Sequence, residues 1–214
     1  GIPEMFVISN VIEDGQKIGS LGDGECLWHT DMAYTEMPPK ANCLYSLEVP
    51  DSEGDAGFLN MYAAYETLPD ELKKRIEGQT IKHDTQYTLD GLDRDDGPPL
   101  ADAIAAGTFD VVCLPGISHP IVRTHSETGR KALYIGRRQN TYINGLSIAN
   151  SEALLDNLWA HVDTCGEQTY HHRWQIGDLL IWDNRCAMHR RDEFSANMRR
   201  IMHRTQVRAD AAPA

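Results

Sequence analysis

Two potential metal ligands near the N-terminus and one near the C-terminus restrict what this chain can fold into. His29 and Asp31 stand two positions apart in Trp28-His29-Thr30-Asp31, and His189 lies far downstream. In a β-strand, residues i and i+2 point to the same face, so His29 and Asp31 can bind one cation from a single rigid segment. The third ligand must then come from another strand, which requires a fold that brings distant parts of the chain together.

Two histidines and one carboxylate on one face of a metal are the ligand set of non-haem Fe(II) oxygenases, and they leave the other face open for oxygen and substrate. The pair alone is a weak signal in a chain with nine histidines, because a surface histidine beside a solvated aspartate gives the same pattern. The segment after His189 adds support, since Arg200 and Arg204 follow eleven and fifteen residues later. Their even spacing would let both face one pocket from one strand. Arginine binds carboxylates through two parallel charge-assisted hydrogen bonds, so an acidic co-substrate is predicted.

The chain resembles the taurine dioxygenase and 2,4-dichlorophenoxyacetate dioxygenase (TauD/TfdA) family of Fe(II)- and 2-oxoglutarate-dependent oxygenases. The resemblance extends roughly from Gly1 to Arg208, and its motifs follow the family's order and spacing. These motifs are Trp28-His29-Thr30-Asp31, Pro38-Pro39, Gly54-Asp55, Phe58 to Glu66, His119-Pro120, Gly129 to Tyr134 and Trp182-Asp183-Asn184-Arg185 to Arg204.

The resemblance implies a role for particular residues. His29, Asp31 and His189 would be the iron ligands. Arg200 would bind the distal carboxylate of 2-oxoglutarate, and Arg204 would lie near its proximal carboxylate and near an acidic group of the substrate. Met32 and Arg137 are further candidates for substrate contact.

The implied reaction uses Fe(II), 2-oxoglutarate and O2 as cofactors. It hydroxylates a small acidic organic substrate, either aryloxyalkanoate-like or sulfonate-like, and releases succinate and CO2. The metal and the co-substrate carry this chemistry, so no residue needs to act as a general base.

The chain departs from the family pattern in three places. Ala56 stands where the family has a threonine that donates a hydrogen bond to the distal carboxylate of 2-oxoglutarate. A hydrogen bond to a charged group is worth roughly 1.5–3 kcal/mol, so weaker 2-oxoglutarate binding is expected. The family usually has several dozen more residues before the region that matches Gly1. Gly24 and Glu25 do not match the residues that hold the amine in taurine-specific members, so taurine is not the expected substrate.

Composition agrees with a single oxygenase domain over residues 1–214. The net charge of −12 argues against nucleic acid and against an anionic membrane surface as partners, because both attract basic proteins. The five cysteines are scattered, which favours reduced thiols in a cytoplasmic protein. There is no apolar run long enough to cross a membrane. We also expect a homo-oligomer.

The predicted elements are mainly strands with flanking helices. Strands are expected over 5–9 and 42–49, and a hairpin over 121–124 and 132–135. Helices are expected over 62–76, with a break at Pro69, and over 151–162, with Ser151 as N-cap. Residues 84–110, rich in aspartate and proline, are expected to form a mobile lid. This pattern predicts a double-stranded β-helix, the jelly-roll fold.

Two other classes of function remain open at this point. A metal-dependent hydrolase also uses histidine and aspartate ligands, but it would leave Arg200 and Arg204 without a task. A non-catalytic or truncated jelly-roll binding protein would have the same fold without turnover, and the short N-terminus and Ala56 are compatible with it.

Overall fold

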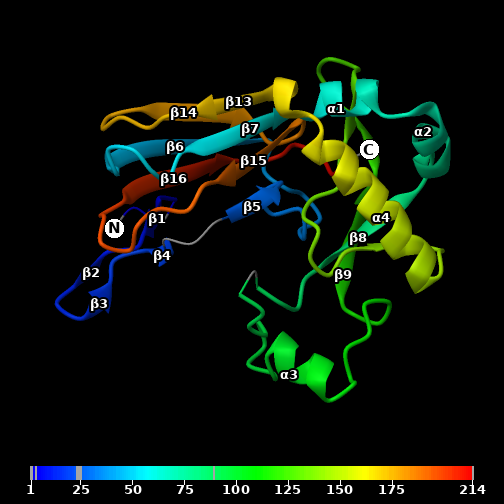
Figure 1. Ribbon diagram of the computed structural model, residues 1–214, viewed down its shortest axis with the longest axis horizontal. Coiled ribbons are helices and arrows are strands. Elements are labelled where there is room, and N and C mark those ends of the chain that lie inside the picture. The colour runs from blue at the N-terminus through cyan, green and yellow to red at the C-terminus, as the bar shows by residue number, and fades with distance from the viewer. Residues whose placement is uncertain (1, 3, 23–25, 89, 214) are drawn as a thin grey trace.

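Two β-sheets pack face to face and form the main body of the protein (Figure 1). The computed structural model describes residues 2, 4–22, 26–88 and 90–213. The larger sheet has the strand order β14 (Leu179–Asp183), β6 (Ala41–Glu48), β16 (Ile201–Val207), β1 (Phe6–Ser9) and β4 (Ser20–Leu21). The smaller sheet has the order β13 (Thr169–His172), β7 (Ala56–Asn60), β15 (Ala187–Arg191) and β5 (Cys26–His29). Strands from both ends of the chain therefore lie side by side in each sheet, as the predicted jelly roll requires.

The space between the two sheets is filled by apolar side chains. Strands alternate their side chains between two faces, and β6 and β16 place Leu44 and Met202 in this space. The buried cluster there comprises Ile8, Leu44, Ala56, Trp174, Trp182 and Met202. Close packing of this cluster holds the two sheets, and the ligand-bearing strands within them, in a fixed relation.

A second, larger core lies under the helices. It joins α1 (Met61–Thr67), α2 (Asp70–Ile76) and α4 (Ile148–Asp163) to the small sheet β12 (Tyr142–Ile143), β8 (Thr80–Asp84), β9 (Gly116–Pro120). The hairpin of β10 (Val122–Thr124) and β11 (Lys131–Leu133) lies in the same region. The remaining elements are β2 (Ile12–Glu13), β3 (Gln16–Lys17), α3 (Leu100–Ala105) and the short helix η1 (Gly166–Gln168).

The predicted elements are found close to their expected bounds. β1 and β6 match the predicted strands, β10 and β11 match the predicted hairpin, and α1 and α2 are separated near Pro69 as expected. The start of α4 was predicted wrongly. The helix begins at Ile148, where the Ser147 hydroxyl accepts a hydrogen bond from the Asn150 amide. Ser151 is buried one turn into the helix, and its hydroxyl instead accepts a bond from the Ile143 amide of β12.

Residues 84–110 form a lobe apart from the two sheets (Figure 1). The lobe contains α3 and several internal backbone hydrogen bonds, among them Leu100 to Gly91 and Arg94 to Gln86. It is thus more ordered than a structureless loop, and its role as a lid stays a prediction. Within the described part of the chain, no helix is both long and apolar enough to span a bilayer.

Candidate metal centre and adjoining pocket

The strand register of the smaller sheet brings the three proposed metal ligands together. β5 runs antiparallel to β15, and His29 at the end of β5 lies directly opposite His189. Their ring centroids are 4.2 Å apart. Asp31 follows two residues after His29 and places its carboxylate against both imidazoles. The residues His29, Asp31 and His189 therefore converge as the sequence predicted.

The potential metal-ligand atoms of these three side chains face one another but form no good hydrogen bonds with one another. His29 Nε2 lies 3.6 Å from Asp31 Oδ1, and His189 Nε2 lies 3.6 Å from Asp31 Oδ2. These separations are too long for good hydrogen bonds, and Asp31 Oδ2 is buried with no hydrogen-bond partner among the described residues. On the other side of its ring, His29 Nδ1 donates to the Leu27 carbonyl at 2.8 Å, which directs Nε2 toward the centre. One cation between the three side chains would satisfy all of them.

The charges at the centre also suit a cation. Burial opposes ionisation of Asp31, but His189, His29 and Arg204 outweigh it and hold the pKa of this carboxyl below its usual range. Burial lowers the pKa of His189 to about 3, with a further contribution from His29, so this imidazole is neutral. Burial also opposes a charge on His29, but Asp31 and Cys26 outweigh it and raise its pKa to about 10. Without metal, His29 therefore holds a proton that a bound divalent cation would displace.

The two predicted arginines occupy different surroundings. Arg204, on β16, reaches Asp31 Oδ1 with its Nη1 at 3.4 Å. Arg200 precedes β16, is 2 % exposed, and lies over the rings of Trp174 and Phe194. Its pKa is lowered to about 9 by burial and by the nearby Arg191. Among the described residues, Arg200 Nε is buried without a hydrogen-bond partner, and burial of the charged guanidinium is costly.

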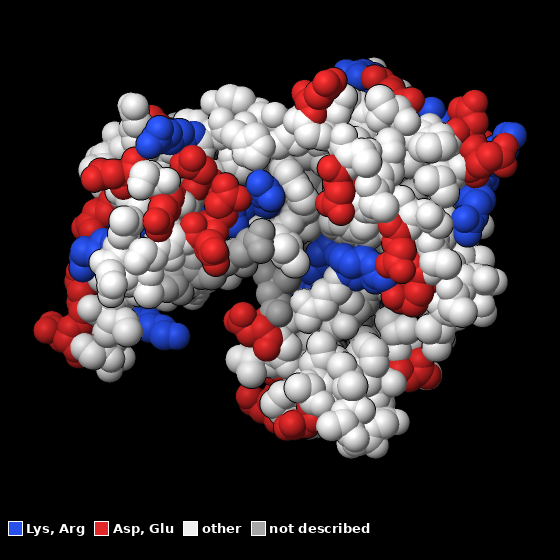
Figure 2. Space-filling view, viewed as in Figure 1, with Lys and Arg blue, Asp and Glu red and all other residues white. Residues whose placement is uncertain are grey.

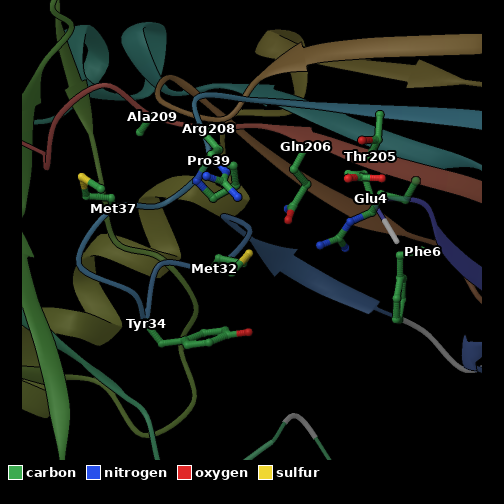
Figure 3. Close-up of a pocket in the computed structure, with 11 residues that line it drawn as sticks. Glu4, Phe6, Met32, Tyr34, Met37, Pro39, Thr205, Gln206, Arg208 and Ala209 are labelled. Atoms are coloured by element: carbon green, nitrogen blue, oxygen red, sulfur yellow. The ribbon is translucent and has the colours of Figure 1, made fainter. Parts of the chain in front are cut away.

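A cavity of about 720 Å³ opens beside the metal centre. Figure 3 shows Tyr34 and Phe6 at two sides of it with Met32 between them. The lining residues are Glu4, Phe6, Met32, Tyr34, Met37, Pro39, Arg204, Thr205, Gln206, Arg208 and Ala209. The cavity is thus apolar over much of its wall and contains two arginines. Met32, a predicted candidate for substrate contact, lines this cavity. Of the two arginines in the lining, Arg204 was predicted from the sequence and Arg208 was not.

Arg137, the other candidate for substrate contact, is not part of this lining. Its guanidinium donates to the Tyr87 carbonyl at 3.1 Å and lies 3.9 Å from the buried Asp84 carboxylate. These contacts tie Arg137 to the base of the 84–110 lobe. The lobe itself reaches the cavity through Arg94, whose guanidinium lies 4.7 Å above the ring of Tyr34.

Basic side chains are present in the hollow of the molecule, with acidic side chains next to them. Figure 2 shows acidic side chains spread over the visible face, with one group of basic side chains in the hollow beside the α3 lobe. Arg204 and Arg208 line the cavity together with Glu4, so local positive charge is available to an anionic ligand in an otherwise acidic protein.

A second polar cluster, which the sequence did not reveal, surrounds Asp183. His125 Nε2 lies 3.0 Å from Asp183 Oδ2, and Cys186 stands close enough to complete a three-donor group. The Asp183 carboxylate is, however, already bonded by Arg185 through Nε and Nη2. The His125 Nδ1 accepts from the backbone amides of Glu127 and Thr128, which leaves the Nε2 proton facing Asp183. This cluster therefore fixes the turn before β15 and does not offer a vacant metal site.

Comparison with known proteins assigns the family. The model of the "Taurine catabolism dioxygenase TauD, TfdA family" matches residues 1–206. The chain belongs to this family. The TauD/TfdA resemblance stated from the sequence motifs is thereby confirmed, and so is the jelly-roll fold.

Curated and solved relatives are similar over nearly the whole chain. The α-ketoglutarate-dependent 2,4-dichlorophenoxyacetate dioxygenase of Cupriavidus pinatubonensis is 33 % identical over 97 % of this chain and 71 % of its own length. The (S)-phenoxypropionate/α-ketoglutarate dioxygenase of Sphingobium herbicidovorans is 34 % identical over 98 % of this chain and 74 % of its own length. The crystal structure of AAD-2 in complex with Mn(II) and N-oxalylglycine aligns with a TM-score of 0.75 at 29 % identity, covering 99 % of this chain and 74 % of that one.

Within this family, the departure at Ala56 has a clear structural setting. Ala56 is buried on β7, opposite Arg191 of β15 and in one apolar cluster with Trp174. Arg191 also lowers the pKa of Arg200, and the Arg200 guanidinium lies over the ring of Trp174. The methyl group of Ala56 thus stands in the vicinity of Arg200 but has no hydroxyl to offer. Gly24 and Glu25, the other departures, lie outside the described residues.

Proposed function

We propose that this protein is an Fe(II)- and 2-oxoglutarate-dependent dioxygenase that hydroxylates a small acidic organic substrate and releases succinate and CO2. The observation that carries the proposal is the convergence of His29, Asp31 and His189 around an unsatisfied, buried carboxylate oxygen. The names of the relatives, which act on dichlorophenoxyacetate and phenoxypropionate, support an aryloxyalkanoate-like substrate. A sulfate ester dioxygenase of Pseudomonas putida, 33 % identical, supports a sulfur-containing anion as a second option.

Each part of the site has a proposed task. His29, Asp31 and His189 hold Fe(II), which supplies O2 activation coupled to oxidative decarboxylation of 2-oxoglutarate. Arg200 neutralises the distal carboxylate of 2-oxoglutarate, and that carboxylate in turn provides the partner that the buried guanidinium lacks. Arg204 lies between Asp31 and the cavity, so it can contact both the proximal carboxylate and an anionic group of the substrate.

The cavity wall matches an aromatic or aliphatic anion. Phe6, Tyr34, Met32 and Met37 provide the apolar and polarisable surface, while Arg204 provides the charge. An apolar wall would also limit the access of water to the centre formed by His29, Asp31 and His189. The lobe of residues 84–110 would close over the bound substrate through the contact between Arg94 and Tyr34.

Anaerobic titration tests the proposal directly. Fe(II) is added to the metal-free protein, followed by 2-oxoglutarate, and the visible metal-to-ligand charge-transfer band is recorded. A band that needs both components supports the proposal, and succinate formation with phenoxyacetates and alkyl sulfates then separates the two substrate classes. Tight Fe(II) binding without the band would support a binding protein without turnover, and an absence of Fe(II) binding would refute the metal centre.

A further inference from the structure

The turn between β14 and β15 carries a buried amide that contacts the metal centre from behind. Asn184 is 1 % exposed and reaches across the fold to Asp31. Its Oδ1 accepts from the Asp31 backbone amide at 3.1 Å, and its Nδ2 donates to the Asp31 carbonyl at 3.0 Å and to the Pro39 carbonyl at 2.9 Å. One side chain thus satisfies both backbone groups of the carboxylate ligand, as a neighbouring strand would do.

The backbone at this point needs such support. Met32, directly after Asp31, has a φ of +54°, in the left-handed region that residues other than glycine rarely adopt. Conformations of this kind persist when the surrounding structure fixes them. The turn at Met32 aims the Asp31 carboxylate at the two histidines and places the Met32 side chain in the cavity wall. Holding this turn therefore fixes one metal ligand and part of the substrate pocket together.

The anchor of Asn184 is itself rigid. Its backbone amide donates to the Lys40 carbonyl at 2.9 Å, and the adjacent Asp183 is bonded by Arg185 and His125. The same turn leads into β15, on which His189 follows five residues after Asn184. The turn thereby connects the strand of one ligand to the backbone of another.

We infer that Asn184 is a positioning residue of the metal centre, which holds the Asp31–Met32 turn in the left-handed conformation that directs the Asp31 carboxylate to the metal. This inference rests on the metal centre of the proposed function. An amide is the side chain that fits, because it combines one acceptor for the Asp31 amide with two donors for the two carbonyls. Aspartate has the same shape but would place a carboxylate oxygen against both carbonyl oxygens.

Metal affinity, measured without turnover, tests this role. Co(II) is titrated into the metal-free protein, and its visible d–d absorption reports both affinity and coordination geometry. Groups that orient metal ligands typically contribute about 10- to 100-fold to metal affinity, so N184A is expected to bind Co(II) at least tenfold more weakly and with an altered spectrum. N144A is the matched control. Asn144 donates to Thr80 and Ser118 on another sheet, so its loss should lower thermal stability without changing the Co(II) titration.

A second substitution tests the link to the strained turn. Glycine adopts the left-handed region without penalty. The double variant M32G/N184A should therefore bind Co(II) at least threefold more tightly than N184A. If N184A does not fold, N184D takes its place, because aspartate keeps the side-chain volume and the bond from the Asp31 amide. N184D is likewise expected to bind Co(II) at least tenfold more weakly than the wild type. A folded N184A or N184D that binds Co(II) within threefold of the wild type and with an unchanged spectrum would overturn the inference. Failure of the wild type to bind Co(II) would instead refute the proposed metal centre.

Discussion

Restoring a hydroxyl at position 56 should strengthen 2-oxoglutarate binding. Ala56 is buried beside Trp174 and opposite Arg191, close to the cation proposed to bind the distal carboxylate. A hydrogen bond from a threonine hydroxyl to this carboxylate is worth roughly 1.5–3 kcal/mol. Because about 1.4 kcal/mol corresponds to a tenfold change in affinity, A56T should lower the 2-oxoglutarate dissociation constant by about 10- to 150-fold.

The control for bulk is A56V, which adds the same shape without the hydroxyl. Extra methyl groups in a packed core cost about 1–3 kcal/mol of stability, and both variants share this cost. The threonine hydroxyl adds a further cost only in the ligand-free protein, where it is buried without a partner. Both dissociation constants come from the charge-transfer band under anaerobic conditions. If A56T and A56V bind 2-oxoglutarate equally, position 56 does not face the carboxylate and the assigned orientation of the co-substrate is wrong.

Four further outcomes are expected. H189A should abolish Fe(II)-dependent succinate formation, and retained activity would contradict the ligand assignment. R200Q should raise the 2-oxoglutarate dissociation constant at least tenfold, because it removes the buried charge, while leaving Fe(II) binding intact in the same titration. Burial, with smaller contributions from charged neighbours, lowers the pKa of His83 from 6.5 to about 3. Between these two pH values the unfolded chain binds a proton at His83 that the folded protein does not bind. The free energy of unfolding is therefore highest above pH 6.5 and falls by about 2 kcal/mol at pH 5. In urea unfolding, the free energy of unfolding of H83L should depend less on pH than that of the wild type. R94A should raise the KM for the organic substrate without affecting 2-oxoglutarate binding, and an unchanged KM would argue against a lid that acts through Tyr34.

The sequence predicted the centre better than its surroundings, for a physical reason. His29 and Asp31 were recognisable because their spacing matches the period of a strand, and antiparallel pairing of β5 with β15 then sets His189 opposite His29. Residue type and spacing carry this information directly. The cavity wall is different, because Phe6, Tyr34 and Gln206 meet only through the tertiary fold and have no common spacing in the chain.

What the sequence could not predict is which of several possible partners a polar side chain contacts. Ser151 is a good N-cap by residue type, but its hydroxyl is taken by the Ile143 amide, and Ser147 caps the helix. Arg137 stays a candidate for substrate contact, and in this structure its guanidinium is engaged by Tyr87 and Asp84. Asn184 was visible within a family motif, yet its bonds to Asp31 depend on a contact between segments far apart in the chain. Local patterns do not specify which of several partners a polar group will find.

The position of β5 in its sheet has a consequence for how the protein responds to metal. Within the described part of the chain, β5 is the edge strand of the smaller sheet and pairs only with β15, through a register that shifts between His189 and Arg191. Edge strands with few ladder bonds open more easily than central ones. A cation held by His29 and His189 would cross-link β5 to its neighbour at the end of this short ladder. Metal loading should therefore slow amide exchange and proteolytic cleavage around β5. The rate of either process at this edge strand would then report whether the metal centre is occupied.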